Sequence, residues 1–262
     1  MNTDWTSVQP GPAAAAAEES PRRSPQDLLH VVRGFSCLFW SMALVGGAHA
    51  IALAGLLPTG WAIGILAASF WPLGWGLWIL PAGEHVSPRW KLRVGRALGL
   101  AVGALLLSPF IVWWWLVPTQ TYFAVNAALQ YVLQIALLAA LNHLAGEGGR
   151  WLEDRGLRRE ARAGIGMVVW LSGCTVAALG LLFHRAGLLT AGLPAVLSQL
   201  ALLPREARAL LLLPYAMTAY VMWRAKESGL RRLVPGGGPL PGAGDATAGI
   251  DAVSPAEDRA RL

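Results

Sequence analysis

Long apolar runs separated by short polar segments set the pattern of this sequence. Several runs reach or exceed the roughly 20 residues that a helix needs to cross the hydrocarbon core of a bilayer. We predict six membrane-spanning helices, over residues 31–57, 61–82, 97–117, 121–145, 163–183 and 207–223. The predicted fold class is therefore all-α, a polytopic membrane protein with six transmembrane helices.

Short connections join these spans in pairs. The tripeptide PTG follows the first span, and PTQ separates the third span from the fourth. Connections of this length place consecutive helices antiparallel, so each pair is expected to form a helical hairpin. Pro72, Pro109 and Pro214 fall inside predicted spans, where each removes a backbone hydrogen bond and is expected to kink its helix.

A shorter apolar stretch covers residues 187–203, between the last two predicted spans. Gly192 and Pro194 interrupt it, and Ser198 and Gln199 dilute its apolar character. A seventh crossing at this point would move the basic segment after the last span to the opposite side of the membrane, against the positive-inside rule. We therefore interpret residues 187–203 as an interfacial or re-entrant helix.

The two ends of the chain lack hydrophobic periodicity. Residues 1–26 are rich in Pro, Ala, Ser and charge, and residues 234–262 are rich in Gly and Pro. Neither end can bury enough apolar surface to offset the entropy of ordering, so both are predicted to be disordered cytoplasmic arms. They flank a six-helix transmembrane domain at residues 27–233. The first apolar run is too long for a signal peptide, so we expect it to stay in the membrane.

Composition agrees with a membrane protein. Hydrophobic residues make up 55% of the chain and charged residues only 14%, with a mean hydropathy of +0.48, whereas soluble domains are nearer a quarter charged. The net charge of +6 does not indicate a nucleic-acid partner, because the basic residues are confined to segments between apolar runs. Most lie on one side of a six-span arrangement, which places both termini in the cytoplasm.

Residue usage rich in Ala, Leu, Arg and Gly suggests a bacterium with a GC-rich genome. We therefore expect a multi-pass protein of the bacterial cytoplasmic (inner) membrane, in contact with the lipid bilayer. The segment 150–162 mixes Trp, Leu and paired charges, and we predict that it lies along the cytoplasmic membrane surface.

Neutral polar side chains recur every four residues in the fourth span, at Tyr122, Asn126, Gln130 and Gln134. In a helix they form one row, which must face something other than lipid. Interhelical hydrogen bonds from such amides can fix how membrane helices rotate against each other without any ligand. We favour this packing role, and a face that lines a ligand site is the alternative.

Tryptophan is frequent, with 13 residues in the chain. Trp71, Trp75 and Trp78 fall on one face of the second span. Such a face usually packs in the core or meets lipid, and the alternative is one wall of a pigment, quinone or lipid site.

Small residues recur at four-residue spacing in two spans. They are Gly64, Ala68 and Gly76 in the second span, and Gly95, Gly99 and Gly103 in or just before the third. Such rows let helix backbones approach closely, either within the chain or against another subunit.

Few residues in the sequence are candidates for catalysis or for binding a cofactor. A membrane haem needs two imidazoles from facing helices at similar depth, and only His49 and His184 lie in the outer halves of predicted spans. No carboxylate lies well inside a span, and neither Cys37 nor Cys174 belongs to a metal-binding motif. No nucleophile motif or phosphate-binding loop is present, so we predict no enzymatic activity and no required cofactor.

Three functional hypotheses follow. The first is a non-catalytic integral membrane subunit or scaffold that packs against other membrane proteins, or against a second copy of itself. The second is a helical bundle that binds or transports a neutral or lipidic small molecule, with the amide row lining its cavity. The third is a haem- or chlorophyll-binding subunit that ligates its cofactor through His49 or His184.

Overall fold

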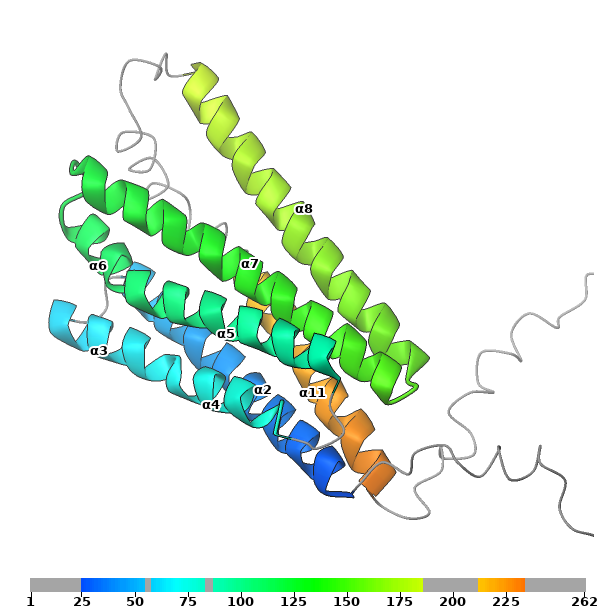
Figure 1. Ribbon diagram of the computed structural model, residues 1–262. Coiled ribbons are helices and arrows are strands. Elements are labelled where there is room, and N and C mark those ends of the chain that lie inside the picture. Colours follow the sequence, from blue (N-terminus) through cyan, green and yellow to red (C-terminus); the bar gives the residue numbers. More distant parts are fainter. Residues whose placement is uncertain (1–24, 55–57, 83–86, 186–211, 234–262) are drawn as a thin grey trace, which may run out of the picture.

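The computed structural model describes residues 25–54, 58–82, 87–185 and 212–233, and the regular structure in these ranges is entirely helical (Figure 1). The helices are α2 (Pro25–Ala54), α3 (Thr59–Ser69), α4 (Trp71–Ile79), α5 (Pro88–Leu107), α6 (Pro109–Leu116), α7 (Thr121–Trp151), α8 (Arg155–Arg185) and α11 (Leu213–Leu233). The predicted arms beyond the domain, apart from the start of α2, and the predicted helix at 187–203 lie outside the described residues. Pro25 and Gln26, which were predicted to belong to the N-terminal arm, are helical and are the first described residues of α2.

Five segments of the described chain are long and apolar enough to cross a membrane. They are Pro25–Ala52, Thr59–Ile79, Pro88–Leu116, Thr121–Trp151 and Arg155–Ala178. This confirms the prediction of an all-α, multi-pass membrane protein. The last helix, α11, is not among the five. It extends ten residues past the predicted end of the sixth span, and its C-terminal half is rich in charge.

Two of the predicted proline kinks are breaks between consecutive helices. Pro72 lies in the first turn of α4, immediately after the break at Phe70, and Pro109 is the first residue of α6. Pro109 cannot donate to the carbonyl of Leu105, and the Ser108 hydroxyl donates to that carbonyl instead, at 2.8 Å. Pro214 lies in the first turn of α11, where its missing N–H breaks no helical hydrogen bond, and residues 186–211 lie outside the described ranges, so the kink expected there stays a prediction.

A tight turn at residues 152–154 joins α7 to α8. The amide of Asp154 donates to the carbonyl of Gly149 at 2.8 Å, and the amide of Glu153 donates to that of Arg150 at 3.1 Å. Glu153 has a φ of 52°, as the C′ residue of this type of helix end requires. The prediction that segment 150–162 lies along the membrane surface is therefore wrong. Residues 150–151 end α7, and residues 155–162 begin α8.

The core is built around α2. This helix packs along α11 on one side and against α4 on another, while α7 packs between α5 and α8. Fully buried side chains fill the centre, among them Phe35, Leu38, Leu73, Leu77 and Leu141. Helix α8 contacts α7 and α11 near its N-terminal end and diverges from α7 toward its C-terminal end (Figure 1).

The charged ends of the helices gather at one end of the bundle. The starts of α2, α5 and α8 lie there with the ends of α7 and α11 (Figure 1). Ion pairs join these ends to one another: Arg93 of α5 pairs with Glu147 of α7, and Arg224 of α11 pairs with Glu160 of α8. The basic segments predicted to share one side of the membrane are thus close together in the fold.

Candidate functional site

A buried hydrogen bond links α2 to α7. The side chain of His49 is 6% exposed and that of Gln130 is 2% exposed. His49 Nδ1 lies 2.7 Å from the Val45 carbonyl oxygen, which can only accept, so Nδ1 donates. The Nε2 of the neutral ring is then an acceptor, and the Gln130 amide nitrogen donates to it at 3.0 Å. Both ring nitrogens of His49 are therefore occupied.

Gln134 lies one turn farther along α7 and has a different environment. Its side chain is 3% exposed and lines a cavity of about 30 Å³, together with Tyr131 and with Tyr215 of α11. Neither polar atom of the Gln134 amide has a hydrogen-bond partner among the described residues. A cavity of this size has room for about two water molecules.

Two aromatic rings lie beside the hydrogen-bonded pair of His49 and Gln130. The ring of Tyr215 lies 6.0 Å from the imidazole of His49, and the ring of Phe70, at the α3–α4 break, lies 6.4 Å from it. Tyr131 lines the same cavity as Gln134, and its hydroxyl lies 3.0 Å from the Thr175 hydroxyl of α8, whose own proton goes to the Leu171 carbonyl. The polar side chains of α7 thus contact three neighbouring helices.

Asn142 makes a second junction, nearer the charged end. Its amide nitrogen donates to the Leu138 carbonyl at 2.9 Å and to the Thr218 hydroxyl of α11 at 2.8 Å. Gly164 of α8 packs directly on this amide, because a Cβ at that position would lie 2.8 Å from Asn142 Cγ. One buried asparagine therefore joins α7, α8 and α11.

The outer members of the predicted amide row, Tyr122 and Asn126, make no hydrogen bond to another helix among the described residues. Tyr122 is exposed, and the Asn126 amide donates to the Tyr122 backbone carbonyl on its own helix at 2.8 Å. The predicted aromatic row is also exposed, with Trp71, Trp75 and Trp78 at 76%, 54% and 70%. These three rings lie on the outer surface, where a membrane would meet them.

The predicted small residues fall into two groups. Gly76 packs on Gly34 and Cys37 of α2, since a Cβ at Gly76 would lie 3.0 Å from the Gly34 carbonyl oxygen, and Gly103 packs on Leu133. Within the described ranges, Gly64, Gly95 and Gly99 have no atom of another helix within 4 Å of the position that a Cβ would take, and Ala68 is exposed.

The two histidines considered as haem ligands are not brought together by any described contact. His49 contacts α2, α7, α11 and Phe70, and its Nε2 lone pair already accepts a hydrogen bond. His184 is exposed on the last turn of α8. Within the described ranges, no group of three or more His, Cys, Asp or Glu side chains could hold a metal ion.

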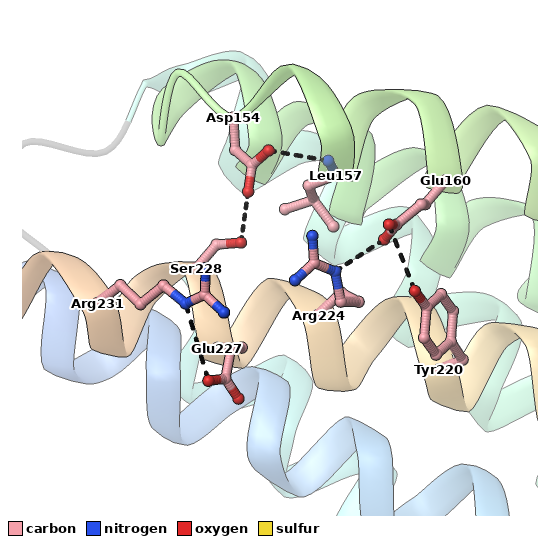
Figure 2. Close-up of polar contacts among 8 residues, drawn as sticks. All are labelled: Asp154, Leu157, Glu160, Tyr220, Arg224, Glu227, Ser228 and Arg231. Atoms are coloured by element: carbon pink, nitrogen blue, oxygen red, sulfur yellow. Dashed lines mark hydrogen bonds and ion pairs between the residues drawn. The ribbon is translucent and has the colours of Figure 1, made fainter. Parts of the chain in front are cut away.

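A polar network ties α8 to α11 at the charged end (Figure 2). Asp154 caps α8 by accepting from the Leu157 amide at 3.0 Å, and its other oxygen accepts from the Ser228 hydroxyl at 2.6 Å. Glu160 accepts from Arg224 at 3.1 Å and from the Tyr220 hydroxyl at 3.3 Å. Glu227 and Arg231 form a longer pair within α11, at 3.8 Å.

The electrostatics of Asp154 follow from this geometry. Partial burial acts to raise the pKa of its carboxyl group. The hydrogen bonds from Ser228 and from the amides of Leu157 and Gly156, together with the charge of Arg224, outweigh burial and hold the pKa below its ordinary value.

Sequence reasoning identified Gln130 and Gln134 but not their surroundings. Thr218, Thr175 and Tyr215 were missed, although a hydroxyl inside an apolar run is a signal for an interhelical hydrogen bond. Comparisons with protein-family models, with curated proteins and with solved structures found no match for this chain.

Proposed function

We propose that this protein is a non-catalytic integral membrane subunit that packs against partner membrane helices through the outward face of α8. In this proposal α11 forms a sixth crossing, the charged end of the bundle faces the cytoplasm, and the protein resides in a bacterial inner membrane. The basic residues gathered at the charged end support this orientation by the positive-inside rule.

The observation that carries the proposal is a row of glycines on the open side of α8. Gly166, Gly173 and Gly180 recur every seven residues, and among the described residues none has an atom of another helix within 4 Å of the position a Cβ would take. Only 17% of the residues in the most apolar stretch of α8 are buried. Rows of small residues allow the close backbone contact that holds membrane helices together, because lipid supplies no hydrophobic drive for association.

The large residues beside this row suit the same role. Trp170 is 66% exposed and Val169 is 62% exposed, so they flank Gly166 and Gly173 on the same outward side. A partner helix that fits against the glycines would meet these side chains at its edges. The exposed Gly95 and Gly99 of α5 offer a second face of the same type.

The experiment is purification of a tagged chain from native membranes in a mild detergent, with the mass of the complex measured by light scattering. We expect the wild-type chain in a stoichiometric complex, either with another membrane protein or with a second copy. Replacing Gly166 and Gly173 together by Leu should release a folded monomer, because a Cβ at these positions would meet nothing within 4 Å in the described part of the chain. Ala67→Leu, at an exposed position of α3 and away from the glycine row of α8, is the matched control and should keep the complex.

The second hypothesis, a bundle that binds a neutral small molecule, has less support. The cavity at Gln134 has a volume of about 30 Å³, whereas sites for small organic ligands are typically about 300–1,000 Å³. Gln130 does not line that cavity, because its amide is used by His49.

A further inference from the structure

A charged groove runs between α7 and α8 at the charged end of the bundle. Its volume is about 320 Å³, and its wall is formed by Glu147 and Arg150 of α7 and by Arg158 and Arg162 of α8. Ala161 and Ile165 line it farther from the turn. The groove is thus basic near the helix ends and more apolar toward the middle of the bundle.

The charges in this groove are not balanced within the described part of the chain. Glu147 is its one carboxylate, and it is already paired with Arg93 and with Arg150, the latter at 3.1 Å. Among the described residues, Arg158 and Arg162 form no ion pair. The Nε of Arg158 is buried and has no hydrogen-bond acceptor, and the Nε of Arg162 reaches only the Arg158 carbonyl, at 3.4 Å.

The position of Arg158 is fixed by packing. Its amide and its Cγ lie against Gly149 of α7, where a Cβ would be 2.9 Å from that Cγ. This packing restrains the first part of the Arg158 side chain, so less side-chain freedom is left to lose when its guanidinium binds an acceptor. Burial of a donor without an acceptor is unfavourable, so an anionic acceptor in the groove stabilises the site.

We propose that this groove binds the phosphate group of an anionic phospholipid. Arg158 and Arg162 donate to the phosphate oxygens, and Ala161 and Ile165 contact the glycerol and the first carbons of an acyl chain. Guanidinium groups suit phosphate because they offer paired donors in a planar arrangement. The length of the groove also suits a lipid, because Asn142, at its inner end, lies about 12 Å along α7 from Arg150.

The test measures lipid retention by the full-length protein. The protein is exchanged into nanodiscs or detergent with phosphatidylglycerol or phosphatidylcholine, and bound lipid is counted by native mass spectrometry. Arg158→Gln with Arg162→Gln removes the two unpaired charges. Arg89→Gln with Lys91→Gln removes two exposed charges from the same end of the bundle, on α5 and outside the groove. A parallel titration uses glycerol phosphate, which has the phosphate but no acyl chain.

We expect the wild type to retain phosphatidylglycerol in preference to phosphatidylcholine. The groove variant should bind phosphatidylglycerol about 30-fold more weakly, since each basic side chain near an anionic lipid contributes about a factor of five. The α5 variant should bind as the wild type does. If Arg158→Gln alters folding, seen as a shift in the melting temperature of delipidated protein, Arg162→Gln alone is used, because this residue is exposed.

Three outcomes overturn the proposal. Equal retention by the groove variant and the wild type shows that the groove is not the site. Equal losses in the two variants show attraction to overall charge only. Binding of glycerol phosphate with no preference for phosphatidylglycerol assigns the groove to a soluble phosphate compound instead of a lipid.

Discussion

The imidazole of His49 and the amide of Gln130 lie 3.0 Å apart in the interior of the bundle, although 81 positions separate them in the sequence. Their hydrogen bond joins α2 to α7, and both side chains are buried. Removing either partner leaves the other without its hydrogen bond. We therefore expect Gln130→Leu and His49→Leu each to destabilise the protein, by about 1–3 kcal/mol.

A double-mutant cycle checks this pair. The free energy of unfolding in mixed micelles is measured for the two single variants and for the double variant. The expected coupling energy is about 0.6–2 kcal/mol, the range of interhelical hydrogen bonds in membrane proteins. Additive effects of the two substitutions would show that the contact contributes nothing to stability.

Gln134 provides the comparison within the same helix. Its amide has no direct partner in the described chain and borders a cavity of about 30 Å³. Because Gln134→Leu breaks no direct hydrogen bond, we expect a stability change within about 0.5 kcal/mol of zero. The same unfolding assay tests it beside Gln130→Leu. A loss as large as that of Gln130→Leu would show that ordered water in the cavity bonds strongly to this amide.

Gly164 and Gly166 form a matched pair on α8. A Cβ at Gly164 would lie 2.8 Å from Asn142 Cγ, and the Asn142 amide is held by Leu138 and Thr218. We expect Gly164→Ala to destabilise the protein by about 1–3 kcal/mol through overpacking. In the described structure nothing lies within 4 Å of a Cβ at Gly166, so Gly166→Ala should be neutral or should gain up to about 1 kcal/mol of helix propensity. Thermal unfolding of the two variants compares them directly, and equal effects would contradict the described packing of Asn142.

Asp154 should make stability depend on pH in the acid range. Its folded-state pKa is below the ordinary value, so its contribution is complete above the unfolded-state pKa of about 3.9 and is lost as the pH falls through the lower folded-state pKa. Asp154→Asn keeps a side chain that caps helices well but removes the charge. We expect this variant to lose less stability than the wild type between neutral pH and about pH 3.

Melting temperatures across that pH range measure the effect. Asp154→Ala removes the cap as well and should lose about 1 kcal/mol at neutral pH. Glu227→Gln, which removes a carboxylate from a longer and more exposed pair, is the control and should follow the wild type. An Asp154→Asn profile parallel to the wild type would assign the acid sensitivity to other carboxylates.

The helical class was predictable because membrane helices satisfy their backbone groups within a single apolar run. The breaks before Pro72 and Pro109 were predictable for a related reason, since proline cannot donate within a helix. Gln130 and Gln134 were expected to avoid lipid, and the structure buries both. Their partners were not predictable, because which helices adjoin α7 depends on the packing of the whole bundle.

Two regions show why local patterns were insufficient. The segment after Arg150 was interpreted as an amphipathic surface helix, but the N-cap at Asp154 and the left-handed residue Glu153 make it a turn between two helices. The final helix ends ten residues later in the chain than the apolar run suggested. Its described position follows contacts with α2, where Gly229 packs on Val32. Tertiary contacts of this kind leave little trace in hydropathy.

The turn between α7 and α8 has a consequence for the order in which the chain acquires its structure during synthesis. Its backbone hydrogen bonds and the cap at Leu157 use only residues 148–157, so the two helices can pair as soon as both have entered the membrane. The second oxygen of Asp154 instead bonds to Ser228, 74 residues later. This hairpin is therefore a preformed surface on which α11, which is synthesised later, docks.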